Sequence, residues 1–206
     1  MGQATTSSVT WRPLGLDDIS NIAEWFWHFE DIAMFDKSLP VPVNIDAMRV
    51  SWRASLECSS PPRAYWFIAE DADKKPAGIA GLESVNYIHG DAVLPVFIAD
   101  DYRKKGLATV MAVALLDLAF NQLRLHRLTT FYREDNEATR RALLSVGFKE
   151  EGRHREGWFA DGIRKDIVIV GILGSEWAAG RDAVIEALKH TSEVSINLSN
   201  WKSCRD

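Results

Sequence analysis

The sequence predicts a mixed α/β domain in which helices flank one sheet. Three observations predict this class. Short apolar runs of strand length occupy 65–98. A strand, helix, strand, helix order then extends from 92 to 146. Two further strand-like runs flank Asp161-Gly162, a dipeptide typical of hairpin turns.

The N-terminal elements follow from capping and spacing signals. Residues 9–12 predict a first strand. Asp17 is the expected N-cap of a helix, because apolar residues recur at helical spacing from 19 to 26. Asn44 predicts the cap of a second helix that reaches about Cys58. A meander of three strands is expected at 65–70, 77–85 and 92–98.

The C-terminal elements alternate until the pattern stops near residue 173. A buried helix is expected at 109–125, a short strand at 128–131, and a helix at 136–146 that Gly147 ends. The expected hairpin strands are 148–159 and 163–172. We therefore predict a domain over 1–173 and an extension over 174–206 with a helix at 181–190 and an edge strand at 194–198. Packing against the domain or a second subunit is the simpler role for this extension.

Composition narrows the function. The chain has 206 residues, 47% of them apolar, and a net charge of −5, which argues against binding nucleic acid through phosphate neutralisation. A mildly acidic surface suits a cationic substrate or simple solubility. Two cysteines make no disulfide framework, and the polar start carries no signal-peptide core. We expect a cytoplasmic protein without a membrane partner.

An anion cradle is the most informative feature. Arg103, Lys104 and Lys105 precede Gly106, between the strand expected at 92–98 and a long helix. The first amides of a helix lack internal partners and carry partial positive charge. A glycine there lets a phosphate approach the backbone.

Two motifs identify a family resemblance. The pattern Arg103-x-x-Gly106-x-Ala108 resembles the acetyl-CoA pyrophosphate loop of the GNAT acetyltransferase superfamily. Asn136, which opens a helix ending in Gly147-Phe148, resembles the second signature of that superfamily. Residues 151–166 resemble the subgroup typified by the ribosomal-protein N-terminal acetyltransferases, and the likeness covers about 10–173.

The resemblance implies a mixed, mostly antiparallel GNAT sheet with splayed central strands, and acetyl-CoA as cosubstrate. It implies that Phe97 and Ile98 bind pantetheine through their backbones. Asn136 would contact the cofactor arm, although helix capping alone would also explain it. The loop residues implied to bind pyrophosphate are Arg103, Lys104, Lys105, Gly106, Leu107, Ala108 and Thr109. The two lysines are equally well explained as solvated surface charge.

Acid and base catalysis are less well defined by the sequence. An ammonium acceptor must lose a proton before it attacks a thioester. Glu83, His89 and Asp91 are the candidate bases, because they lie on or after the strand that precedes the expected cofactor strand. Many GNAT enzymes have a general-acid tyrosine seven residues after the asparagine, where this chain has Leu143. Ser145, Tyr132, Thr139 or water are the open alternatives.

The acceptor is expected near Glu30 and Asp31, in a segment rich in aromatic and acidic residues. Trp25 and Phe29, four residues apart, are expected to be core. The histidines show no metal-ligand spacing, so we expect no metal. The resemblance implies an N-acyltransferase that acts by direct transfer in a ternary complex on a small-molecule amine or a protein N-terminus. A non-catalytic acyl-CoA-binding module is the alternative, and a homodimer is an option.

Overall fold

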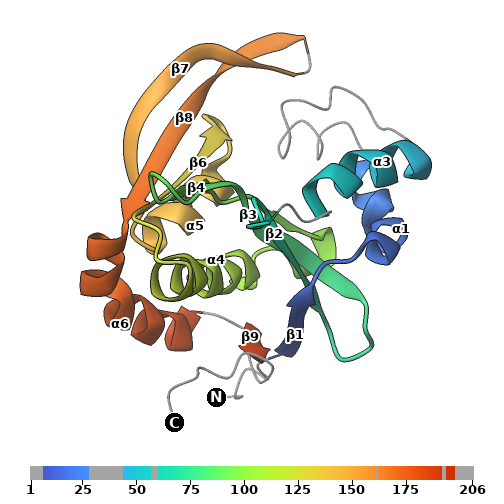
Figure 1. The fold of residues 1–206 in the computed structure, drawn as a ribbon, viewed down its shortest axis with the longest axis horizontal. Helices are drawn as coiled ribbons and strands as arrows, with labels where there is room; N and C mark the ends of the chain where they lie inside the picture. Colours follow the sequence, from blue (N-terminus) through green and yellow to red (C-terminus); the bar gives the residue numbers. More distant parts are fainter. Residues whose placement is uncertain (1–6, 28–43, 57–59, 161, 192–193, 198–206) are drawn as a thin grey trace.

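The computed structural model describes residues 7–27, 44–56, 60–160, 162–191 and 194–197. Their strands form one mixed sheet in the order β7-β8-β6-β4-β3-β2-β1-β9, and β5 pairs with β3 (Figure 1). All pairs are antiparallel except β4–β6 and β1–β9. The strands are β1 (Ser7–Pro13), β2 (Tyr65–Glu70), β3 (Pro76–Asn86), β4 (Asp91–Val93), β5 (Val96–Ile98), β6 (Arg127–Arg133), β7 (Lys149–Ala160), β8 (Ile163–Leu173) and β9 (Val194–Asn197). The predicted mixed, mostly antiparallel sheet is confirmed.

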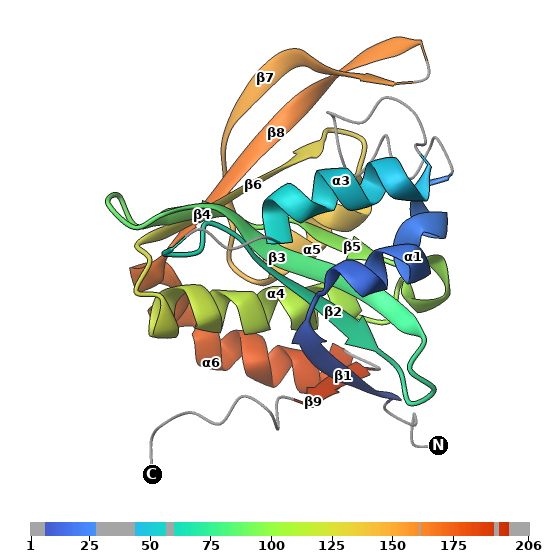
Figure 2. The same ribbon diagram turned by 45° about the vertical axis from the view of Figure 1, so that its right-hand side comes forward.

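Helices cover both faces of the sheet (Figure 2). The short helices η1 (Leu16–Asp18), α1 (Ile19–Ile22) and η2 (Ala23–Phe26) pack with α3 (Ile45–Leu56) on one face. The helices on the other face are α4 (Leu107–Asp117), η4 (Leu118–Gln122), α5 (Glu137–Ser145) and α6 (Gly174–Thr191). Each face has its own hydrophobic cluster. We call the α1–α3 side the first face and the α4 side the second face.

Strand β2, which lies between β3 and β1, is buried on both sides. Trp66 and Ile68 belong to the cluster on the first face, whereas Phe67 and Ala69 belong to the cluster on the second. Side chains alternate across a strand, so a strand covered on both faces is apolar throughout. The continuous run from Tyr65 to Ala69 is therefore explained by its place in the sheet.

The strand expected at 92–98 is two strands, which corrects the prediction. Leu94 makes the last backbone hydrogen bond toward β6, from its N to Thr129 O at 3.0 Å. Pro95 has no N–H and instead accepts from Gly81 N at 3.1 Å. After Pro95, β3 is the only described strand with which β5 pairs. The sheet therefore opens between β5 and β6, as the family resemblance implied.

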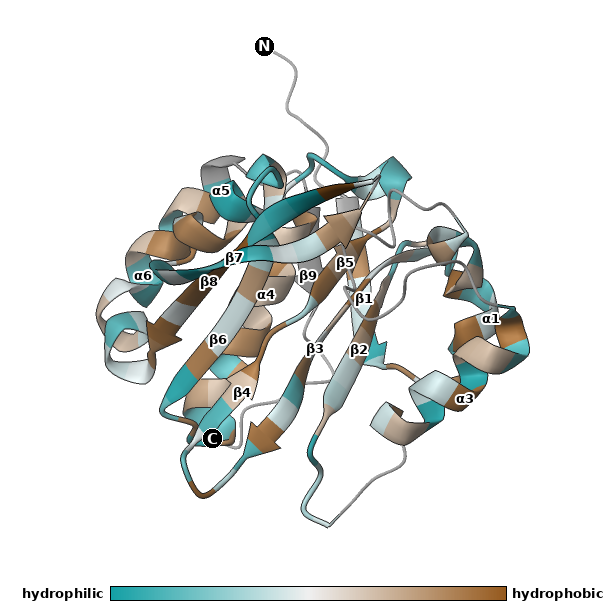
Figure 3. Ribbon diagram, turned by 90° about the horizontal axis from the view of Figure 1, so that it is seen from above, coloured by the Kyte–Doolittle hydropathy of each residue, from teal (hydrophilic) through white to brown (hydrophobic). Residues whose placement is uncertain are grey.

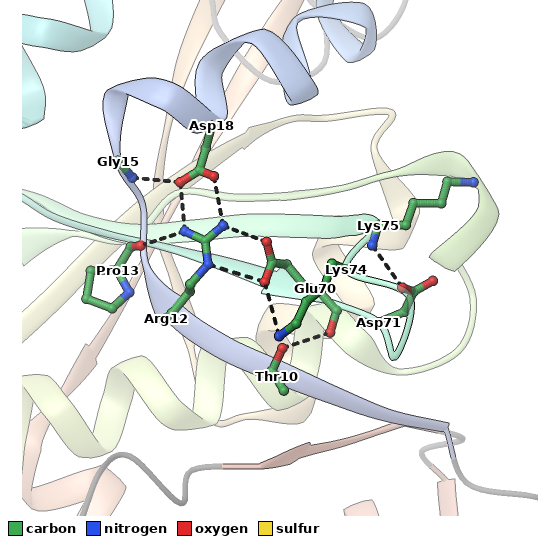
Figure 4. A network of polar contacts seen from close by, with 9 residues as sticks. All are labelled: Thr10, Arg12, Pro13, Gly15, Asp18, Glu70, Asp71, Lys74 and Lys75. Atoms are coloured by element: carbon green, nitrogen blue, oxygen red, sulfur yellow. Dashed lines mark hydrogen bonds and ion pairs between the residues drawn. The ribbon is translucent and has the colours of Figure 1, made fainter.

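The prediction of one continuous helix that begins at Asp17 is also wrong. The first turn is a 3-10 helix whose N-cap is Gly15, and the chain then forms α1 and η2. Arg12 on β1 binds Asp18 in this first turn (Figure 4). The Asp18 carboxylate also accepts from Gly15 N at 2.9 Å. Asp18, rather than Asp17, fixes the start of this segment.

The elements after β5 follow the prediction with shifted ends. Helix α4 begins at Leu107, two residues before the expected 109, and it gives way to the π-helical turn η4. Gly147, at φ +98°, follows α5 as expected. The hairpin of β7 and β8 turns at Gly162, at φ +77°. Most of β7 is hydrophilic (Figure 3) and exposed.

The C-terminal extension contributes to the hydrophobic core. Helix α6 begins at Gly174, so it is longer than the helix expected at 181–190. Trp177 is 2% exposed, and its indole donates to Asp117 Oδ1 on α4 at 3.0 Å. Arg181 also binds Asp117, at 2.7 Å. The expected edge strand is confirmed as β9, which pairs in parallel with β1. The domain boundary at residue 173 stays a prediction.

Candidate active site

The anion cradle has the backbone geometry that the sequence predicts. Gly106 is the N-cap of α4 at φ +82°, and Lys104 before it lies at φ +62°. In the described structure, no side chain caps the first turn. The N–H groups of Leu107, Ala108 and Thr109 therefore lack intrahelical acceptors, at the positive end of the helix dipole. This concave, uncapped backbone suits a phosphate oxygen.

The basic side chains beside the cradle are partly held by local contacts. Arg103 Nε donates to Ile98 O at 3.1 Å, and its guanidinium forms an ion pair with Asp100 at 2.8 Å. Lys105 donates to Asp101 O at 2.7 Å. Arg103 and Lys105 are therefore both engaged in local contacts beside the cradle. Lys104 is exposed, and a phosphate would compete with Asp100 for Arg103.

The opened sheet presents backbone groups of β5 beside the cradle. Ile79 pairs with Phe97, and the flanking bonds join Gly81 N to Pro95 O and Ala99 N to Ala77 O. Alternate residues of an antiparallel strand direct their backbone groups to opposite edges. Phe97 therefore bonds toward β3, and Ile98 directs its N–H toward the gap. This register favours Ile98 over Phe97 for a backbone contact with pantetheine.

Phe97 instead contributes its ring to the first face. It stacks on Trp25, with ring centroids 5.5 Å apart and planes at 18°, and the Arg103 guanidinium lies 5.6 Å from its centroid. Trp25 is half-buried and packs in the core as predicted. Phe29, Glu30 and Asp31 lie outside the described residues. Phe97 therefore links the cradle to the aromatic residues of α1 and η2.

The structure resolves which face Glu83 uses. Trp66 pairs with Gly81 across β2 and β3, so Glu83, two residues further on, shares the first face with both. The Trp66 indole donates to Glu83 Oε1 at 3.2 Å, and Trp52 packs edge-on against Trp66 with centroids 4.7 Å apart. The carboxylate thus lies beside aromatic residues on the face that helices α1 and α3 cover. Such surroundings suit an amine.

His89 and Asp91 lie elsewhere, at the turn between β3 and β4. The register places Asp91 opposite Asn86, whereas Glu83 lies opposite Val93. His89 is exposed, and Asn86 Oδ1 accepts from its backbone N at 3.2 Å. Asp91 is half-buried. The three candidate bases therefore occupy two places, and Glu83 is in contact with the Trp66 indole.

The position of the missing tyrosine is apolar. Leu143 is 6% exposed and packs in the core of the second face, so it offers no proton donor. Asn136 caps α5, because its Oδ1 accepts from Thr139 N at 3.1 Å. Ser145 Oγ donates back to Ala142 O at 2.7 Å. The cap uses only Oδ1 of Asn136, so its Nδ2 amide can still donate to a cofactor.

Tyr132 is the buried alternative for the acid. Its hydroxyl donates to Glu150 Oε1 at 3.0 Å, and Arg140 Nε donates to the same oxygen at 3.2 Å. Burial raises the pKa of Tyr132 to about 12, and the bond to Glu150 adds to this. The phenol therefore keeps its proton at neutral pH.

Sequence reasoning missed Trp66 and Gly81. A glycine within an apolar strand is a signal of close approach by a neighbouring group. The expected meander of 65–70 and 77–85 also implied cross-strand pairs. Only the register, however, identifies Trp66 as the residue opposite Gly81.

Two absences concern the described residues only. None of their helices is both long and apolar enough to cross a bilayer. They also contain no group of three histidine, cysteine or carboxylate side chains arranged to hold a metal ion.

Comparisons with known proteins agree with this geometry. A family model described as an acetyltransferase (GNAT) domain matches residues 8–149. The chain is 32% identical over 111 residues to spermidine N(1)-acetyltransferase of Vibrio cholerae, covering 54% of this chain and 64% of that protein. It is 30% identical over 105 residues to the putative ribosomal N-acetyltransferase YdaF of Bacillus subtilis, covering 51% and 57%. The sequence match thus spans about three fifths of the length of these relatives.

A structural comparison extends further along the chain. The crystal structure of spermidine N-acetyltransferase from Vibrio cholerae in complex with CoA and spermine superposes with a TM-score of 0.74 and 25% identity. The superposition covers 82% of this chain and 98% of that one. The family model covers more than half of the chain, including the cradle and Asn136. The chain therefore belongs to the GNAT acetyltransferase domain family.

Proposed function

We propose that this chain is an N-acetyltransferase that transfers an acetyl group from acetyl-CoA to a primary amine. One observation carries the proposal: the uncapped N-terminus of α4 follows the strand where the sheet opens, with one short 3-10 turn at Asp100–Tyr102 between them. An anion site beside exposed strand backbone suits a cosubstrate that carries a pyrophosphate and an amide-containing arm. Membership of the GNAT family supports the same activity.

The cosubstrate site is assigned residue by residue. The amides of Leu107, Ala108 and Thr109 would hold the pyrophosphate, and exposed Lys104, three residues before Leu107, would add positive charge. Ile98 N–H would bind the pantetheine arm. The further members of the proposed site are Phe97, Arg103, Lys105, Gly106 and Asn136. When bound, acetyl-CoA supplies a thioester whose carbonyl an amine can attack.

Glu83 is the side chain that we assign to the acceptor. An ammonium group has a pKa near 10, and an unperturbed glutamate has a pKa near 4.3, so direct proton transfer between them is unfavourable by about 6 pH units. A carboxylate among aromatic rings therefore attracts the ammonium. Once one proton is lost to solvent, the neutral amine attacks the thioester carbonyl, and Glu83 accepts the proton that the nitrogen releases as it becomes an amide. His89 and Asp91 remain alternative bases at the β3–β4 turn, with Glu30 and Asp31 as further acceptor ligands. We expect direct transfer in a ternary complex.

The acceptor class follows from charge and from the relatives. Spermidine N-acetyltransferases are among the similar proteins, and a putative ribosomal N-acetyltransferase is another. The net charge of −5 and a carboxylate beside tryptophans favour a small cationic amine over a protein N-terminus. A homodimer and a cytoplasmic location stay predictions, which sedimentation and cell fractionation would test.

Calorimetry with acetyl-CoA, followed by thiol-release assays, tests the proposal. The acceptors are spermidine, an amino sugar and a short N-terminal peptide. We expect binding and turnover with spermidine. Binding without turnover on any acceptor would favour a non-catalytic acyl-CoA-binding module. No binding would contradict the assignment of the cradle.

A further inference from the structure

We infer that Trp66 is a positioning residue that holds Glu83 in its reactive orientation; the inference rests on the proposed acetyl transfer. The two side chains lie on neighbouring strands of the first face. The Trp66 indole N–H donates to Glu83 Oε1 at 3.2 Å. Trp66 is 6% exposed, whereas Glu83 is half-buried. A buried donor thus binds a carboxylate that is itself only half-buried.

Gly81 makes this contact possible. A Cβ atom at Gly81 would lie 2.7 Å from Cδ2 and 2.9 Å from Cε3 of Trp66, and 2.5 Å from Tyr65 O. Contacts this short are not tolerated in proteins without a shift of the neighbours. The absent side chain therefore lets the indole lie across β3, where its N–H reaches the residue two positions further on.

Trp52 on α3 completes the support. Its ring packs edge-on against Trp66, with the planes at 72° and the centroids 4.7 Å apart. This contact limits rotation of the indole. Trp66 also packs within the hydrophobic core of the first face, which restricts the ring further. The direction of the N–H is consequently fixed by packing, and this N–H is a contact that orients Glu83 Oε1.

The hydrogen bond from Trp66 also predicts in which direction the pH dependence should move when this donor is removed. A donor to a carboxylate stabilises its charged form. Removing the donor should therefore raise the pKa of Glu83 and move the acidic limb of kcat/KM to higher pH. The size expected is about 0.5–1 pH unit, with a roughly tenfold fall in kcat at pH 7 as the carboxylate loses its orientation.

Trp66→Phe tests this, because it keeps a ring and removes the N–H. The matched control is Trp11→Phe. Trp11 is 5% exposed, its Nε1 has no partner in the described structure, and it stacks on Phe67 on the second face. With spermidine as acceptor, Trp66→Phe should shift the acidic limb, and Trp11→Phe should leave it in place. An unshifted limb in Trp66→Phe, with wild-type kcat, overturns the inference.

A spectroscopic measurement separates this inference from the proposed function. The indole N–H resonance of Trp66, assigned from its loss in Trp66→Phe or by sequential assignment, should titrate with Glu83 in the wild type and lose that titration in Glu83→Gln. A titration that persists in Glu83→Gln means that Trp66 does not hold Glu83, and the inference fails. If the wild type acetylates no amine, the proposed function fails and the catalytic part of the inference fails with it. The indole titration still decides the contact, even if Trp66→Phe does not fold.

Discussion

Replacing Arg12 with methionine should destabilise the chain strongly at neutral pH. The guanidinium donates to Asp18 Oδ1 at 2.7 Å and Oδ2 at 2.8 Å, and to Glu70 Oε1 at 2.5 Å and Oε2 at 3.2 Å (Figure 4). The carboxylate side chains are only 11% and 8% exposed. This cluster ties β1 and β2 to η1, where the helices of the first face begin.

The loss of stability arises because Arg12→Met leaves the buried carboxylates of Asp18 and Glu70 without the guanidinium. Breaking a buried ion pair from one side costs about 3–5 kcal/mol, because a buried charge loses its partner. Arg12 is 39% exposed, Lys74 remains 3.9 Å from Glu70, and Gly15 N still donates to Asp18. We therefore expect the lower end, about 3 kcal/mol, of a total stability of roughly 5–15 kcal/mol.

The pH dependence has a definite sign. The hydrogen bonds from Arg12 hold the pKa of Asp18 below its ordinary value, so this group stabilises the wild type above pH ~4 and loses that contribution as pH falls through the folded pKa. In Arg12→Met, burial without a partner should instead raise the pKa of Asp18. The variant then regains stability as pH falls toward 4, because the carboxyl is neutralised. The difference between the two proteins should be largest at pH 7.

Urea denaturation at pH 7 and pH 4 measures both effects. The control is Arg153→Met on exposed β7, whose arginine is 51% exposed and lies 3.5 Å from Glu134. It should cost less than about 1 kcal/mol at either pH. A cost below about 1 kcal/mol for Arg12→Met, or the same cost at both pH values, would refute the reasoning. Adding Asp18→Asn to Arg12→Met should recover part of the loss.

Three further predictions concern the cradle, β3 and the extension. Arg103→Ala combined with Gly106→Glu should weaken acetyl-CoA binding about 100-fold in calorimetry, because a carboxylate replaces the anion site; unchanged affinity would mean that the cradle is misplaced. Gly81→Ala should cost about 1–3 kcal/mol in urea denaturation through its clash with Trp66, and a wild-type midpoint would show that the ring gives way. Asp117→Ala should cost about 2 kcal/mol and lower Tm by about 4–8 °C, because two α6 donors lose their acceptor; an unchanged melt would count against a structural role for α6.

Local signals in the sequence identified most elements of the fold. The cap at Asn136, the left-handed glycines at 106, 147 and 162, and the apolar run of β2 each depend on a few neighbouring residues. The family pattern from Arg103 to Ala108 depends on the same short range. These features were predictable because capping, positive φ and side-chain alternation are properties of a short segment.

What the sequence missed depends on partners that are distant along the chain. The strand expected at 92–98 breaks at Pro95. Leu94 still bonds to β6, whereas Pro95 and the strand β5 after it bond to β3.

The sequence alone determined that this chain has an α/β fold, an anion cradle and a place in the GNAT family pattern. Only the tertiary structure decided that Glu83 faces Trp66 on the first face, that Asp18 rather than Asp17 meets Arg12, and that α6 is anchored to α4. For Arg12–Asp18 and for α6–α4, the reason is that side chains of different elements meet only in the folded chain. For Glu83 and Trp66, the physical reason is register. A shift of one residue in the pairing of two strands turns every side chain to the other face, and local sequence patterns do not specify which residues lie opposite each other.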